Sequence, residues 1–293
     1  MVVSGKGGVG KSTVAAALGL AGVRAGRRTI VVEVAERQDV ARTLGAAPTA
    51  PEEELVDGLH HLSVDPASAL AEYLNDQLAS RLVSEIVASS RTFGYLTAAT
   101  PGRHELLTIG KVWDLAQDER RIPGAGHYDL VVLDAPASGH ALAILRSPRT
   151  FGAVARAGPI ARQARAIDAM LSNPARTGVV LVARPEEMPV NETLELRDGL
   201  RSEVGLDVDL VVANGVLPNR FSARDARALA AAAPAPEVDA ALAAHARARA
   251  QQAQLARLRR HVSAPVVTLP FVFSPELGSD DVRALSRRLG RAL

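Results

Sequence analysis

The chain has 293 residues, of which 47% are hydrophobic and 23% are charged, a composition typical of a folded globular protein. The formal net charge is only +2, so the molecule as a whole is not a nucleic-acid-binding polycation. It contains no cysteine, which excludes disulfides, iron–sulfur clusters, cysteine-ligated zinc and thiol nucleophiles. Only three of its 34 basic residues are lysines, and two of these, Lys6 and Lys11, lie in one glycine-rich run.

Short apolar, β-branched runs recur along the chain and alternate with segments of helical patterning. Most of these runs are apolar at consecutive positions, which predicts strands buried on both faces of a parallel sheet. The alternation predicts βαβ units. The predicted strands span residues 1–4, 29–34, 59–65, 129–134, 177–183, 208–213 and 265–270. The predicted helices span residues 11–25, 39–44, 192–204 and 241–261.

The interval 66–123 has helical patterning and no good strand, so it is predicted to be a helical insertion over one end of the sheet. We therefore expect one α/β domain over residues 1–293, with a mostly parallel sheet of seven or eight strands flanked by helices. A leucine face in the insertion is interpreted as core, with client binding as the alternative; it comprises Leu70, Leu74, Leu78 and Leu82. No targeting segment or apolar run of membrane-spanning length is present, which favours a cytoplasmic location.

Residues 5–12 read GKGGVGKS and match the phosphate-binding pattern GxxxxGK[ST]. Its glycines let the backbone N–H groups surround a phosphate, and the following helix N-terminus adds positive charge. Lys11 is expected to contact the β- and γ-phosphates, since a compact ammonium fits inside such a loop where the wide guanidinium of arginine does not. The residues expected to hold the nucleotide are Gly5, Gly7, Gly8, Val9, Gly10, Lys11, Ser12 and Thr13.

A second motif, HYDLVVLDAPASGH, spans residues 127–140. Asp134 ends its predicted strand. An acid at the tip of a buried strand beside a phosphate loop can hold Mg²⁺ through water, with the Ser12 hydroxyl as a direct ligand. Ser12 and Asp134 are therefore the predicted metal residues, and ATP or ADP with Mg²⁺ the predicted ligands.

Lys6 is additional to the basic loop pattern, and GKGGVGKS resembles the deviant phosphate loop of MinD, ParA, the nitrogenase iron protein and the arsenite-pump ATPase. The segment from Asp134 to His140 narrows the resemblance to the ArsA-like ATPases, and weaker matches extend over nearly the whole chain. This resemblance implies a P-loop NTPase fold, ATP hydrolysis, a conformational switch and a nucleotide-sandwich dimer in which Lys6 reaches the partner's nucleotide. It also implies that Asn214, at the end of a predicted strand, contacts adenine.

The sequence departs from the family at the first switch. The family reads DPA after the second strand, with the Asp positioning the attacking water, and the Asp position falls on Ala35 here. Glu33, where a MinD-like protein carries an acid, or Glu36 could orient the water or the Mg²⁺ shell instead. We expect slow hydrolysis, with Lys6, Lys11, Glu33 and Asp134 as catalytic candidates.

Two functions remain open at this stage. The chain is either a dimeric Mg²⁺-dependent ATPase or a nucleotide-binding partner subunit with degraded hydrolysis that pairs with an active paralogue, so homodimer and heterodimer both stand. The absence of thiols removes support for metalloid and zinc sites. No client or membrane partner is identified. The arginine-rich segment 220–260 is interpreted as a solvated helix face; because it lacks interleaved aromatic residues, no nucleic acid is expected, and a ParA-like DNA-associated ATPase is the alternative.

Overall fold

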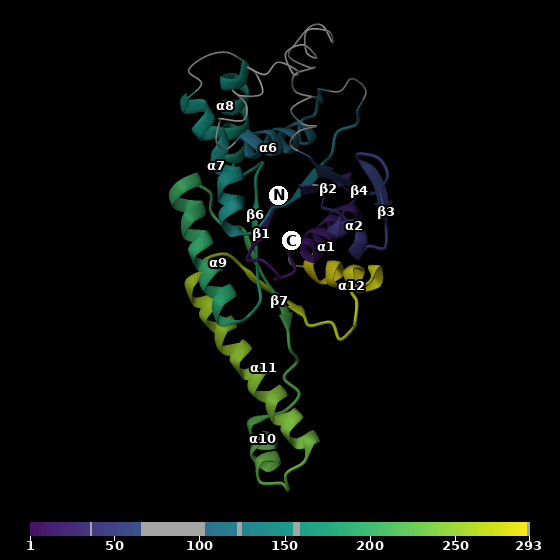
Figure 1. The fold of residues 1–293 in the computed structure, drawn as a ribbon, viewed down its shortest axis with the longest axis vertical. Coiled ribbons are helices and arrows are strands. Elements are labelled where there is room, and N and C mark those ends of the chain that lie inside the picture. The colour runs from purple at the N-terminus through teal and green to yellow at the C-terminus, as the bar shows by residue number, and fades with distance from the viewer. Residues whose placement is uncertain (36, 66–102, 122–124, 155–158, 292–293) are drawn as a thin grey trace, which may run out of the picture.

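The computed structural model describes residues 1–35, 37–65, 103–121, 125–154 and 159–291. One eight-stranded sheet runs through it in the order β3-β4-β2-β5-β1-β6-β7-β8, with helices on both faces (Figure 1). All neighbouring strands are parallel except β3 and β4. The predicted α/β class and mostly parallel sheet are confirmed.

The strands agree closely with the apolar runs of the sequence. They are β1 (Val2–Gly5), β2 (Thr29–Val34), β3 (Glu53–Val56), β4 (Leu59–Val64), β5 (Leu130–Asp134), β6 (Val179–Ala183), β7 (Leu210–Val216) and β8 (Val266–Pro270). Only β3 was not predicted. It forms an antiparallel hairpin with β4 through Asp57 and Gly58, both with positive φ, the conformation that an Asp-Gly hairpin turn requires.

The helices cover both faces of the sheet. They are α1 (Lys11–Arg24), α2 (Asp39–Thr43), α6 (Arg103–Leu115), α7 (Ser138–Val154), α8 (Pro159–Leu171), α9 (Glu187–Gly199) with the π-helical turn η1 (Leu200–Val204), α10 (Ala223–Ala230), α11 (Pro236–His261) and α12 (Ser279–Leu289). Helix α6 is the described part of the predicted insertion and packs against α7 and α8. The rest of that insertion through residue 102, including the leucine face, lies outside the described residues.

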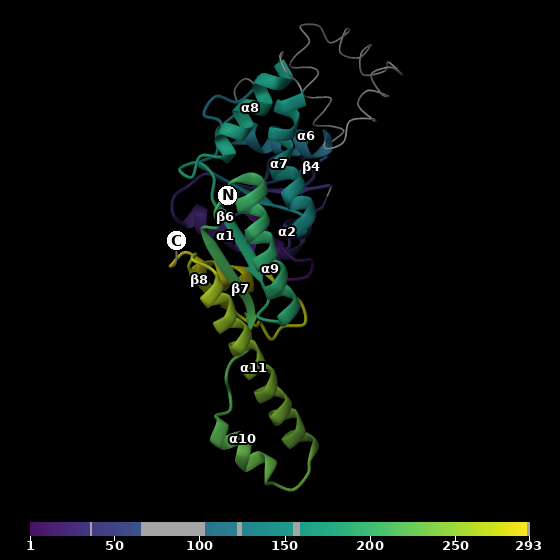
Figure 2. The ribbon, with the colours of Figure 1, turned by 90° about the vertical axis from the view of Figure 1, so that its left-hand side faces the viewer.

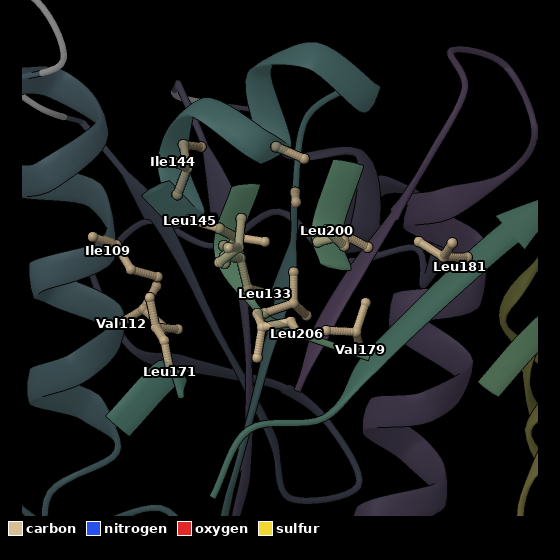
Figure 3. Packing of buried hydrophobic residues seen from close by; sticks show 14 of the residues in the cluster. Ile109, Val112, Leu133, Ile144, Leu145, Leu171, Val179, Leu181, Leu200 and Leu206 are labelled. Carbon is tan, nitrogen blue, oxygen red and sulfur yellow. The ribbon is translucent and has the colours of Figure 1, made fainter. Parts of the chain in front are cut away.

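Two hydrophobic clusters sandwich the sheet. One lies between the sheet and helices α6 to α9, and Figure 3 shows Leu133 of β5 close to Leu145 of α7 within this cluster. The other lies under α1, α2 and α12. Gly19 lets α1 approach the sheet closely, because a Cβ there would lie 2.8 Å from side-chain atoms of Leu59 and Val31. The central strands are thus buried on both faces, as their continuous apolar runs predicted.

Helix α10 and the first half of α11 project from the sheet as a helical arm, visible in two views (Figures 1 and 2). Helix α11 begins at Pro236, earlier than predicted, where proline suits the first turn. Most arginines of the segment 220–260 are exposed on this arm and along α11. None of the helices in the described ranges is long and apolar enough to cross a membrane.

Candidate nucleotide-binding site

The loop of residues 6–10 joins β1, at the centre of the sheet, to α1. Gly10 stands at the N-cap of α1 with φ 91°, in the left-handed region that glycine adopts without steric cost. A Cβ at this position would overlap the side-chain amide of Asn214. The chain therefore needs glycine at this corner both for the backbone conformation and for the close approach of β7.

Lys11 lies in the first turn of α1 and is only 8% exposed. Its Nζ donates to the backbone carbonyl of Lys6 at 3.1 Å, across the loop. Burial lowers the pKa of Lys11, the Asp134 carboxylate opposes that effect, and the Arg37 guanidinium adds to it. A partly desolvated ammonium inside a glycine-rich loop is the arrangement that suits contact with phosphate oxygens.

Asp134 ends β5 directly beside the loop and is fully buried. Its Oδ2 accepts a hydrogen bond from the Ser12 hydroxyl at 2.7 Å. Burial raises the pKa of Asp134 to about 6, against the lowering effects of Ser12, Arg37 and Lys11, whereas Glu33 raises it further. The structure thus brings together Lys11, Ser12 and Asp134, as the sequence predicted.

These residues fit a magnesium ion. The Oδ1 atom of Asp134 is buried and has no hydrogen-bond partner within the described ranges, and the Ser12 hydroxyl lies on the other carboxylate oxygen. Carboxylate and hydroxyl oxygens are the hard ligands that Mg²⁺ takes, usually together with phosphate and water oxygens. In the part of the chain that the structure describes, no group of three His, Asp or Glu residues could hold a metal by itself.

Arg37 also reaches this corner, a contact that sequence reasoning missed. Its Nη2 donates to the backbone carbonyl of Asp134 at 3.1 Å and lies 3.4 Å from the Asp134 Oδ2 atom. Its Nε donates to the carbonyl of Val34 at 3.2 Å. The available signal was an arginine two residues after Ala35, shortly after the end of β2.

Glu33 pairs in register with Asp134 on the neighbouring strand but has different partners. Its Oε1 accepts the backbone N–H of Asp39 at 3.0 Å, and its Oε2 accepts that of Val40 at 3.1 Å. His61 Nε2 donates to the same Oε2 at 2.8 Å. Both oxygens of Glu33 thus hold the start of α2 and a buried histidine, and no pattern in the sequence pointed to His61.

The backbone next to Glu33 turns sharply. Ala35 follows β2 with φ 63°, a left-handed conformation that is uncommon for a residue with a Cβ, and its N–H donates to the carbonyl of Val64 at 3.0 Å. Glu36, the other candidate for orienting water, lies outside the described residues.

Lys6 points away from the interior of the loop. Its Nζ lies 2.5 Å from Glu192 Oε1 on helix α9 of the same chain, and both side chains are about one-third exposed. The lysine that the sequence singled out is therefore at the surface of the loop, and its partner in the single chain is an acid.

Asn214, in the last part of β7, donates from Nδ2 to the carbonyl of Val9 at 2.9 Å. This hydrogen bond ties the loop to β7. A cavity of about 600 Å³ opens between the ends of β6 to β8 and helix α11, and Leu217, the residue that follows β7, is part of its lining. Phe271 and Phe273 stand at its wall in edge-to-face contact, 4.9 Å between ring centroids. The cavity also carries three arginines, Arg184, Arg220 and Arg247.

The sequence of the chain decides its family. Residues 1–158 and 153–232 match the profile of the anion-transporting ATPases. The chain belongs to this family. The anion-transporting ATPases are nucleotide-binding proteins, so membership accounts for the phosphate loop and confirms the ArsA-like resemblance read from its motifs.

Named ATPases align with between 50% and 78% of the chain. ATPase BagA of Mycobacterium tuberculosis is 31% identical over 236 residues, which cover 76% of this chain and 67% of BagA. An arsenical pump-driving ATPase of Escherichia coli is 28% identical over 265 residues, 78% of this chain but only 41% of that protein. ATPase ASNA1 homolog 1 of Paramecium tetraurelia is 27% identical over 158 residues, 50% of this chain and 42% of the relative.

Proposed function

We propose that this chain is a Mg²⁺-dependent ATPase that hydrolyses ATP to ADP and phosphate and couples its nucleotide state to a conformational change. The observation that carries the proposal is the buried corner in which Lys11, Ser12 and Asp134 meet beside the glycine-rich loop. A bound Mg²⁺ would neutralise charge on the phosphates during phosphoryl transfer. Lys11 stabilises the same charge, and Ser12 and Asp134 hold the metal.

The nucleotide base can be accommodated between Asn214 and the cavity that Phe271 lines. Asn214 contacts the loop through Val9, and the lining of the cavity with Phe271 at its wall includes Leu217, three residues further along the chain. Aromatic rings there offer a stacking surface for a purine, and the Asn214 amide offers hydrogen bonds to its edge. We propose that the base lies between Asn214 and this cavity, with the phosphates in the loop.

A dimer completes the proposal. Lys6 is at the surface, held by Glu192 of its own chain, so it can exchange that acid for a phosphate on a neighbouring subunit. Sedimentation with a non-hydrolysable ATP analogue tests this: wild type should associate and Lys6→Ala should lose hydrolysis while keeping its nucleotide affinity. An unchanged hydrolysis rate in Lys6→Ala would contradict the cross-subunit role.

A partner subunit with degraded hydrolysis is the second candidate, and the surroundings of Glu33 favour it. Both Glu33 oxygens are already bonded within the protein, and the adjacent position of the family's switch aspartate is Ala35. In that case the chain binds nucleotide, and a paralogue in a heterodimer supplies the group that positions water. The client or membrane partner of either assembly is open.

ATP turnover by the purified chain tests the two candidates. Lys11→Ala removes the phosphate-binding ammonium and should lower turnover and nucleotide affinity at least about a hundredfold. Arg201→Ala, which removes an exposed charge from η1, is the matched control and should behave as wild type. Turnover by the lone chain that Lys11→Ala abolishes supports the enzyme. Binding without turnover, restored by mixing with a paralogue, supports the partner subunit, and no binding at all contradicts both.

A further inference from the structure

Arg37 makes the one cationic contact to the Asp134 carboxylate that the described residues show. Its guanidinium lies 3.4 Å from Oδ2 and also donates to the Asp134 backbone carbonyl. The Arg37 side chain is one-third exposed, whereas the Asp134 side chain is fully buried. The mobile end of this pair is therefore Arg37, which sits on the segment that links β2 to α2.

A buried carboxylate needs a compensating positive charge. In the structure, Arg37 supplies it by direct contact and Lys11 supplies it from a greater distance. A bound cation would interact most favourably with this same carboxylate, because the Ser12 hydroxyl lies on Oδ2 and Oδ1 has no partner within the described ranges. Arg37 and a metal ion thus draw on one negative charge.

Other groups around Arg37 allow it to leave. The Asp39 carboxylate at the start of α2 lies 3.8 Å from its Nη1, and the Val34 carbonyl holds its Nε. Neither contact depends on Asp134. If a metal ion bound at the carboxylate repels the guanidinium, Arg37 can keep both contacts while its outer end turns toward solvent.

We propose that Arg37 is an internal cation that occupies the magnesium carboxylate in the nucleotide-free protein and competes with Mg²⁺ for it. The inference rests on the proposed function and adds a way for the site to signal: when Mg²⁺-nucleotide is bound, Arg37 must release Asp134, so the contact between Arg37 and the end of β5 is lost.

The test measures how strongly Mg²⁺ and nucleotide support each other's binding. The dissociation constant of a fluorescent ADP analogue is measured with MgCl₂ and with EDTA. The value in EDTA divided by the value in MgCl₂ is the ratio that reports how strongly the metal supports nucleotide binding. Removing one charge that repels the metal should raise this ratio about tenfold in Arg37→Ala, the size expected for unit charges a few ångströms apart at a partly buried site. Arg37→Gln, which keeps a hydrogen-bond donor without the charge, should do the same and guards against misfolding of the alanine variant.

Arg42→Ala is the matched control, because it removes the same charge from α2 at a side chain that pairs with Asp39 and is 77% exposed. Its ratio should stay within about twofold of wild type. A merely structural role for Arg37 would change both dissociation constants alike and leave the ratio unaltered, which would overturn the inference while nucleotide binding itself stands. Wild-type protein that binds no nucleotide under either condition would overturn the proposed function and this inference together.

Discussion

Two acids lie side by side at the ends of neighbouring strands, Glu33 on β2 and Asp134 on β5, and their surroundings differ completely. Both are fully buried. Glu33 has both oxygens bonded to protein, through two backbone N–H groups of α2 and through His61. Asp134 has one oxygen bonded to Ser12 and near Arg37, and the other without a partner within the described ranges.

The difference teaches that strand-end position alone does not make an acid available for chemistry. Glu33 is saturated by groups that fix the backbone, so its removal should damage the fold. Asp134 contacts only the side chains of Ser12 and Arg37 through Oδ2 within the described ranges, and its Oδ1 has no hydrogen-bond partner there. Its removal should therefore damage ligand binding. The predictions below change one acid of this pair or the residue beside it, and ask whether the distinction holds.

Glu33→Ala should give the largest loss of stability. It removes two bonds at the start of α2 and leaves His61 buried without its partner, which together should lower the free energy of unfolding by about 4 kcal/mol. Urea denaturation measures the change. Glu33→Gln, which retains an acceptor oxygen, should lose about half as much. A stable Glu33→Ala protein with lost ATP turnover would instead make Glu33 a catalytic residue.

Asp134→Asn should have an effect on stability that depends on pH. Because burial raises the pKa of Asp134 to about 6, the folded protein holds this proton more tightly than the unfolded chain does. The free energy of unfolding of the wild type should therefore fall as pH rises from about 4 to about 6, by up to roughly 3 kcal/mol. The asparagine variant lacks this loss and should gain on wild type over that window in nucleotide-free, EDTA-treated samples. An equal stability difference at about pH 4.5 and about pH 7.5 would contradict the account.

Ala35→Asp should have the smallest effect on the fold and a measurable one on the reaction. Aspartate tolerates the left-handed conformation at this position better than most residues, so unfolding free energy should change by less than about 0.5 kcal/mol. If the position is that of the family's switch aspartate, ATP turnover should rise about tenfold. Ala35→Asn, which has the same shape without a base, is the control. Equal turnover in the two variants would contradict a catalytic role for an acid at position 35.

Features that depend on neighbouring residues could be predicted from the sequence, and features that depend on contacts between distant parts of the chain could not. The phosphate loop, α1 and Asp134 could be predicted because glycine spacing, Lys11 and a strand ending in an acid are local signals. Strand β3 could not, since its Glu-Glu-Leu-Val sequence lacks an apolar run, although Asp57-Gly58 marked its hairpin. The partners of Glu33 come from α2 and from His61 on another strand, and only the folded chain brings them together.

The projecting arm and the Arg37 contact also had no local signal in the sequence. Alanine-rich helices such as α10 and α11 give no indication of where they leave the body of a protein, because alanine suits both buried and exposed helix faces. Arg37 lies 97 residues from Asp134 in the chain. Such long-range pairs become visible only once the register of β2 and β5 is known.

The most direct test of the central claim is the Mg²⁺ dependence of nucleotide binding in Asp134→Asn and Glu33→Gln, measured with the same fluorescent nucleotide and corrected for the folded fraction. The account predicts that Asp134→Asn loses most of the gain in affinity that Mg²⁺ gives wild type, on the order of tenfold or more, while Glu33→Gln keeps it. The reverse pattern, with Mg²⁺ dependence lost in Glu33→Gln and kept in Asp134→Asn, would contradict the assignment of the two strand ends.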